Sequence, residues 1–255
     1  MLIDTHCHID QFPSPETVVR ECEKNALRVV AVTNLPSHFA LAADRLRGNK
    51  YVSAALGMHP LSIVDGIREL AAFKRLAPHA DYIGEIGLDF SRHGEASKSL
   101  QERVFEEILT SIEDRPRFIT LHSRGAESAV LEALCRHKIR GAVFHWFTGS
   151  GKVLDLILEA GHYVSVNPAM LSTANGKRIM GTAPRESVLV ETDAPFAKIK
   201  GRASHPKDIV AVYDALATHW RIGFDEVAES VMRNFLKAQS GNIAQSPKKS
   251  HNITN

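Results

Sequence analysis

The chain has 255 residues, of which 44% are hydrophobic, enough for one domain with a large buried core. No apolar run approaches the roughly 18 residues of a membrane helix, and no basic and apolar leader opens the chain, so we expect no membrane partner and no secretion. Three cysteines at unrelated spacings are typical of reduced thiols, which predicts a cytoplasmic location. The net charge of +2 is too small to indicate a nucleic-acid partner by itself.

Short apolar runs alternate with segments of helical periodicity. The predicted strands span residues 2–8, 28–33, 51–57, 81–86, 117–122, 141–146, 161–167 and 187–193. The predicted helices are a segment that opens at Ser14-Pro15-Glu16, then 37–48, 62–77, 100–112, 125–138 and 149–160. This alternation predicts a protein of the α/β class, a (β/α)₈ TIM barrel in a single domain over residues 1–239. A doubly wound open sheet is the alternative, which the lack of a glycine-rich loop after the first strand disfavours.

The C-terminal part of the chain differs in character. Residues 205–238 have the pattern of two packing helices, and we expect them to cover part of the barrel. Residues 240–255 are polar and lack apolar anchors, which predicts a disordered C-terminal tail.

Polar side chains stand where the predicted strands end. In a barrel of this kind the strand ends meet at the C-terminal mouth, where chemistry takes place. Alternate side chains of a strand share a face, so His6 and His8 point the same way. Because His, Glu and Asp fill most of these positions, metal binding is favoured over chance. The strand-end residues are His6 and His8, Thr33, His59, Glu85, His122, His145, Asn167 and Asp193.

The distribution of these side chains suits two divalent metal ions, with Glu85 bridging them. The first ion would be held by His6, His8, Glu85 and Asp193, and the second by His122, His145 and Glu85. Imidazoles with carboxylates suit Zn²⁺ or Mn²⁺, and Mg²⁺ less well. Such a pair lowers the pKa of a bound water to near 7. Glu85 or Asp193 would accept the water proton, and Asp193 is favoured because Glu85 serves as the bridge.

Two further groups of residues indicate substrate contacts. His59 is suited to orient a phosphate oxygen or to protonate a leaving group. Basic residues after the last strand, together with one after the fifth, would neutralise phosphates, while nearby aromatic rings would stack on bases. The basic residues are Arg124, Lys198, Lys200, Arg202 and Lys207, and the aromatic ones are Trp146, Phe147 and Phe196.

Six motifs resemble those of the TatD family of metal-dependent DNases, in the family's order and over about residues 1–240. They are Asp4-Thr5-His6-Cys7-His8, Gly57-Met58-His59-Pro60, Gly84-Glu85-Ile86-Gly87-Leu88-Asp89, Leu121-His122-Ser123-Arg124, Phe144-His145-Trp146-Phe147-Thr148-Gly149-Ser150 and Glu191-Thr192-Asp193-Ala194-Pro195-Phe196. The resemblance implies a TIM barrel, two divalent ions, and hydrolysis of phosphodiester bonds, often as a 3′→5′ exonuclease on DNA. It implies the six metal ligands already named, with His59 and Arg124 near the substrate.

Two segments depart from the usual family pattern. The stretch from Phe196 to Pro206 replaces a segment rich in Arg, Asn, Glu and Pro, and the stretch from Ser165 to Leu171 differs at the end of the seventh strand. Both, with His145-Trp146-Phe147, are more similar to QatD, the TatD-like component of the bacterial Qat anti-phage system. That resemblance implies a role in phage defence beside other Qat system proteins.

Three functions are consistent with the sequence. The first is a metal-dependent nuclease that acts on nucleic acid, with DNA favoured. The second is a two-metal hydrolase of a small amide, lactone or modified nucleobase; many such barrels bridge their ions with a lysine where this chain has Glu85. The third is a non-catalytic, metal-stabilised subunit of a defence complex.

Overall fold

Eight parallel strands form the core of the protein. The computed structural model describes residues 1–241, so residues 242–255, most of the predicted tail, lie outside the described part of the chain. The strands confirm the predicted barrel, and each overlaps its predicted run. They are β1 (Ile3–Cys7), β2 (Arg28–Ala31), β3 (Val52–Ala54), β4 (Tyr82–Gly87), β5 (Phe118–His122), β6 (Val143–Phe144), β7 (Tyr163–Val166) and β8 (Val188–Val190).

Hydrogen bonds close the strands into a barrel. β1, β2 and β3 pair in that order, and so do β4 to β8. At one seam, the amide of Leu56 donates to the carbonyl of Tyr82 at 2.9 Å, and the amide of Gly84 donates to Leu56 at 2.9 Å. At the other seam, the hydroxyl of Thr5 in β1 donates to the carbonyl of Val190 in β8 at 2.8 Å. The doubly wound open sheet is therefore excluded.

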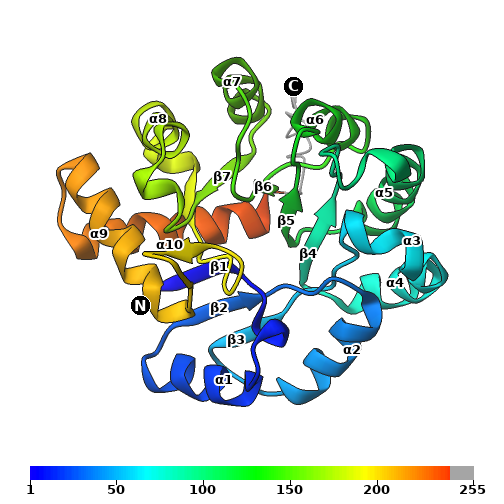
Figure 1. Cartoon of the computed structure of the whole chain (residues 1–255), viewed down its shortest axis with the longest axis horizontal. Coiled ribbons are helices and arrows are strands. Elements are labelled where there is room, and N and C mark those ends of the chain that lie inside the picture. Colours follow the sequence, from blue (N-terminus) through cyan, green and yellow to red (C-terminus); the bar gives the residue numbers. More distant parts are fainter. Residues whose placement is uncertain (242–255) are drawn as a thin grey trace, which may run out of the picture.

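Helices surround the strands on the outside (Figure 1). Strand residues are buried almost without a break along their length, as expected where a parallel sheet is covered on both faces. The helices are α1 (Pro15–Lys24), α2 (Pro36–Arg45), α3 (Ile63–Gly66), α4 (Leu70–Leu76), α5 (Lys98–Ile112), α6 (Glu127–Arg136), α7 (Gly151–Glu159), α8 (Ala174–Thr182), α9 (Ile209–Trp220) and α10 (Phe224–Ser240). Among residues 1–241, no helix has the length and apolar character needed to cross a membrane.

Helix α10 closes the end of the barrel where the strands begin, and Figure 1 shows it crossing behind them. The ring of Phe235 packs against Tyr82 and Phe118, the first residues of β4 and β5, with ring centroids 6.4 and 4.9 Å away. The side-chain amide of Asn234 (Nδ2) donates to the carbonyl of Val188, the first residue of β8, at 2.9 Å. The opposite end, where the strands finish, stays open for the polar side chains.

Two predicted helices differ from the structure. The predicted helix 62–77 is divided into α3, a 3₁₀ turn and α4. The division falls at Gly66, the last residue of α3, and glycine lowers helix propensity. The predicted helix 37–48 begins one residue earlier, with Pro36 at its first position. Ser37 therefore lies within the first turn, where its amide and hydroxyl both donate to Glu69, at 2.7 and 2.9 Å.

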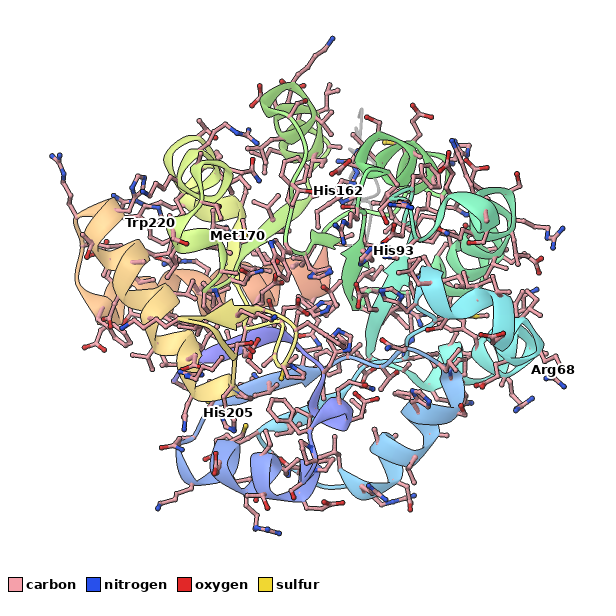
Figure 2. All side chains as sticks on the ribbon, viewed as in Figure 1. Arg68, His93, His162, Met170, His205 and Trp220 are labelled. Carbon is pink, nitrogen blue, oxygen red and sulfur yellow. The ribbon has the colours of Figure 1, made fainter. Side chains whose placement is uncertain are left out.

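His162, labelled in Figure 2, is a buried histidine away from the strand-end cluster. It precedes β7, is 2% exposed and packs its ring against Phe144. Neither ring nitrogen has a hydrogen-bond partner in the described part of the chain. Burial, together with the positive charge of Arg140, lowers the pKa of His162 to about 4. This side chain therefore stays neutral in the folded protein.

Candidate metal centre at the barrel mouth

The structure gathers the six predicted ligands at the open end of the barrel. His6 and His8 come from the end of β1, Glu85 from β4 and His122 from the end of β5. His145 follows β6, and Asp193 follows β8. All six side chains are buried or nearly so. Residues separated by up to 187 positions are thus brought to one place by the parallel strands.

Four of these side chains surround one small volume. The Nε2 atom of His8 lies 3.2 Å from the Glu85 Oε2 and 3.6 Å from the Asp193 Oδ1. The Nε2 atom of His6 lies 3.6 and 3.9 Å from the same two oxygens. Two ligands about 2.1 Å from one ion in tetrahedral geometry lie about 3.4 Å apart. The spacings match ligands that share a cation.

The chemistry of His6 supports the same conclusion. Its ring is fully buried, and its Nδ1 lies 2.8 Å from the Thr120 hydroxyl. Its Nε2 faces the two carboxylates and has no hydrogen-bond partner among residues 1–241. A buried polar atom without a partner costs about 1–3 kcal/mol. A cation held by this nitrogen would supply the missing interaction, so these residues fit a divalent metal ion.

The second oxygen of Glu85 faces a different group of histidines. Its Oε1 lies 2.7 Å from the Nδ1 of His122, 2.9 Å from the Nε2 of His145 and 3.6 Å from the Nε2 of His59. The rings of His145 and His6 stack with centroids 3.9 Å apart, so the two groups adjoin. Glu85 therefore stands between two groups of imidazoles, with one oxygen toward each. His59 lies in the second group with Glu85 and His122, close enough to share a cation with them, although it was not predicted as a metal ligand.

The buried charges shift one another's pKa. Burial alone would raise the pKa of Glu85, but the neighbouring imidazoles of His59, His145 and His122, the last through a hydrogen bond, hold that pKa well below its usual range. Burial raises the pKa of Asp193 to about 7. Burial lowers the pKa of His6 to about 4. Without a cation, the surrounding histidines therefore favour the ionised form of Glu85, whereas burial favours the protonated form of Asp193.

Backbone geometry around Glu85 and Asp193 fixes both side chains. A Cβ on Gly84 would stand 2.3 Å from the Thr120 Cγ2, so only glycine fits beside the residue that supports His6. The amide of Asp193 donates to the carbonyl of His6 at 2.9 Å. The carboxylate of Asp4 accepts both the amide of Thr192, at 2.9 Å, and its hydroxyl. β1 and the residues after β8 are thereby held in register.

A cleft of about 490 Å³ opens above these residues. Its wall includes His59, Arg124, Trp146 and Phe196. The Nδ1 of His59 accepts the amide of Leu61 at 3.1 Å, so the ring proton is on Nε2, the atom nearer Glu85. Burial lowers the pKa of His59 to about 4, which keeps this imidazole a neutral donor.

The predicted basic residues after Asp193 lie apart from this wall. Lys198 and Arg202 belong to a short hairpin of β9 (Lys198–Ile199) and β10 (Arg202–Ala203), with Lys200 in its turn. None of the three lines the cleft described above. The guanidinium of Arg202 is bound to the carboxylate of Asp208 through two contacts of 2.7 Å. Of the basic residues singled out from the sequence, the structure brings Arg124 to the cleft.

The prediction that Phe147 stacks on a base is wrong. Phe147 is fully buried in the core, and its ring packs against Gly149. It cannot reach a base, because its side chain points away from the cleft that its neighbour Trp146 lines. Trp146 has a left-handed φ of 39°, and its backbone amide donates a hydrogen bond to the Glu191 Oε1 at 3.0 Å, which supports this conformation.

Two buried acids of the quoted motifs, Asp89 and Glu191, contact the histidines of the cluster although neither was predicted as a site residue. Asp89 places its Oδ2 2.8 Å from the Nε2 of His122. Glu191 is fully buried, with its Oε1 3.5 Å from the Nδ1 of His145 and its Oε2 accepting the Ser165 hydroxyl. The available signal for Glu191 was its position directly after β8, in the same motif as Asp193.

The barrel and the cluster at its mouth define the class of the protein, a metal-dependent hydrolase on an α/β barrel. The chain belongs to the TatD family, because the protein-family model described as TatD related DNase matches residues 3–239.

Its relatives bear related names. A Bacillus subtilis protein called uncharacterized metal-dependent hydrolase YabD is 28% identical, over 92% of this chain and 97% of the relative. Human deoxyribonuclease TATDN3 is 25% identical, over 92% of this chain and 93% of the relative. The crystal structure of YjjV, a TatD homologue from Escherichia coli, superposes with a TM-score of 0.83 at 23% identity, covering 94% of this chain and 98% of YjjV. This last likeness shows that the fold is shared.

Proposed function

We propose that this protein hydrolyses phosphodiester bonds of nucleic acid, with DNA as the favoured substrate, and that two divalent cations serve the reaction. The proposed ligands are the six side chains at the barrel mouth, with Glu85 bridging. One observation carries the proposal: the two oxygens of Glu85 face two separate groups of histidines. The names of relatives such as human deoxyribonuclease TATDN3 support the choice of substrate.

The residues suit the chemistry of hydrolysis. When bound, the cations would supply a water that ionises near neutral pH. Asp193 is the proposed acceptor of the water proton, because Glu85 is engaged with the histidines of both groups. His59 presents its Nε2 proton toward the cleft as a neutral donor, for a phosphate oxygen or a leaving group.

The cleft walls suit a nucleotide. Arg124 is the proposed phosphate contact, since a guanidinium binds phosphate oxygens with two parallel hydrogen bonds. Trp146 and Phe196 are the proposed stacking surfaces for a base. Phe196 is 51% exposed and meets the ring of His8 edge-on at 4.8 Å, so its other face is open to a ligand. Lys198, Lys200 and Arg202 are proposed as outer contacts for a longer strand.

The test is cleavage of oligonucleotides labelled at the 3′ or the 5′ end, with added Mg²⁺, Mn²⁺ or Zn²⁺. We expect cleavage by the wild-type protein and loss of at least about 1,000-fold in Glu85→Gln and Asp193→Asn, because a group that acts in the transition state is removed. Asp65→Asn, which changes an exposed carboxylate on α3, serves as the control. Unchanged cleavage by the two site variants would contradict the proposal. Turnover of amides, lactones or modified bases without cleavage of nucleic acid would favour the alternative hydrolase.

A role in anti-phage defence beside other Qat system proteins, in the cytoplasm, is a further part of the proposal. It is supported by the sequence after Asp193, which departs from the usual family pattern and folds as the β9–β10 hairpin. The three cysteines are free, which is consistent with a reducing compartment. The test is phage plating on cells that carry the complete system with wild-type protein or with Glu85→Gln. Equal protection by both would contradict a catalytic role in defence.

A further inference from the structure

The imidazole of His122 is held between two carboxylates. Its Nδ1 lies 2.7 Å from the Glu85 Oε1, and its Nε2 lies 2.8 Å from the Asp89 Oδ2. Glu85 is the proposed bridging ligand. Asp89 is not a proposed ligand, and among residues 1–241 it forms no hydrogen bond with a proposed ligand other than His122. Asp89 follows β4 and is 1% exposed. It therefore acts on the site through His122.

Asp89 is anchored from outside the metal centre. Its amide donates to the Gln101 Oε1 at 2.8 Å, and Gln101 is a fully buried side chain of α5. The side-chain amide of Gln101 (Nε2) in turn donates to the carbonyl of Gly94 at 3.0 Å. The position of the carboxylate is thus set by the helix and by the loop before it.

Both oxygens of Asp89 act as acceptors. The Oδ1 accepts the amide of Ser91 at 2.8 Å, and the Oδ2 faces the Nε2 of His122. Only an ionised carboxylate can accept on both sides. An asparagine that still accepts from Ser91 would turn its NH₂ donor toward His122, and this contact suits only the tautomer whose ring proton is on Nδ1.

We infer that Asp89 is a positioning residue that holds the Nε2 proton of His122, and thereby leaves Nδ1 as the ring atom that binds the second cation beside Glu85. This inference rests on the proposed two-cation function. A histidine ligand commonly donates its other ring proton to a carboxylate, and loss of that partner weakens metal binding about 10–100-fold. The contact also orients the ring, because a histidine at the end of a strand is otherwise free to turn about χ2.

The test compares cation binding to the whole protein in three forms. Mn²⁺ is titrated into wild type, Asp89→Asn and Gln101→Met, and free Mn²⁺ is followed by electron paramagnetic resonance. We expect wild type to bind two cations and Asp89→Asn to bind the first normally and the second about 10–100-fold more weakly. Gln101→Met removes the anchor of the loop but leaves both oxygens of Asp89, so it should retain most of the affinity for the second cation.

Nitrogen-15 spectra of the histidine rings provide a second readout that does not depend on activity. In the zinc-loaded wild type and in Gln101→Met, His122 should carry its proton on Nε2, and in Asp89→Asn this signal should be lost or shifted.

The outcomes separate the inference from the proposed function. Failure of the wild type to bind a second cation would contradict the proposed function itself. If the wild type binds two cations, and Asp89→Asn binds the second cation with the same affinity and shows an unchanged His122 signal, the role of Asp89 is overturned while the proposed function stands. Equal weakening in Asp89→Asn and Gln101→Met, with the Nε2 proton retained in both, would show that Asp89 only shapes the loop.

Discussion

Replacing His162 by leucine should change how the stability of the protein depends on pH. The folded state holds this imidazole neutral, with a pKa of about 4, whereas the unfolded chain has the ordinary value of 6.5. As the pH falls below 6.5, the unfolded state takes up a proton first, and the wild type loses stability. The loss should end near pH 4, where the folded state is protonated too.

The magnitude follows from the difference between the two pKa values. Each unit is worth about 1.4 kcal/mol, so the 2.5-unit difference between 6.5 and 4 corresponds to about 3 kcal/mol. Because the side chain is 2% exposed, solvent screening does not reduce this figure appreciably. His162→Leu removes the titrating group together with two ring nitrogens that lack hydrogen-bond partners.

Urea unfolding at pH 7.5, 6.5, 5.5 and 4.0 provides the assay, with metal chelated so that cation release does not contribute. The difference in unfolding free energy between the two proteins cancels the other titrating groups that they share. We expect His162→Leu to gain about 3 kcal/mol relative to wild type between pH 7.5 and pH 4. A difference that stays constant over this range would refute the reasoning.

Three further predictions follow from packing and charge. Phe235→Ala should cost about 3–5 kcal/mol in urea unfolding, because the ring that closes the barrel is 1% exposed, and a loss below about 1 kcal/mol would be inconsistent with that packing. Gly84→Ala should lower the free energy of unfolding by about 1–3 kcal/mol and weaken Mn²⁺ binding, because the new Cβ meets Thr120. Wild-type affinity for Mn²⁺ in this variant would contradict the prediction. Arg124→Ala should raise the KM for an oligonucleotide about 10-fold with little change in kcat, whereas Lys200→Ala, away from the cleft wall, should change it less than about 2-fold. Equal effects of the two would contradict the assignment of Arg124.

The barrel was predictable because its strands are short, apolar and regularly spaced. The helices were less so. Helix α8 was missed, since Gly176 and Gly181 lower its propensity. The structure explains Gly176: a Cβ there would stand 2.1 Å from the carbonyl oxygen of Met170, so the glycine is required by a contact that no local pattern reveals. The hairpin of β9 and β10 was missed for a similar reason, because two-residue strands leave no periodic pattern.

The six candidate ligands were predictable because strand ends meet at one mouth. Their partners were not. The contact between Thr120 and His6 joins residues 114 positions apart, and the contact between Asp89 and His122 depends on an anchor in α5. The environment of the basic residues was also hidden, since the pairing of Arg202 with Asp208 requires the fold of the hairpin. Phe147 was misjudged because a single residue of register decides whether a side chain faces the cleft or the core.

The most direct test of the central claim is the anomalous diffraction of manganese in crystals of the whole protein. The account predicts two peaks about 3.5–4 Å apart, one on each side of the Glu85 carboxylate. The first should be bound by His6, His8 and Asp193, and the second by His122 and His145. A single peak, or two peaks that do not share Glu85, would contradict it.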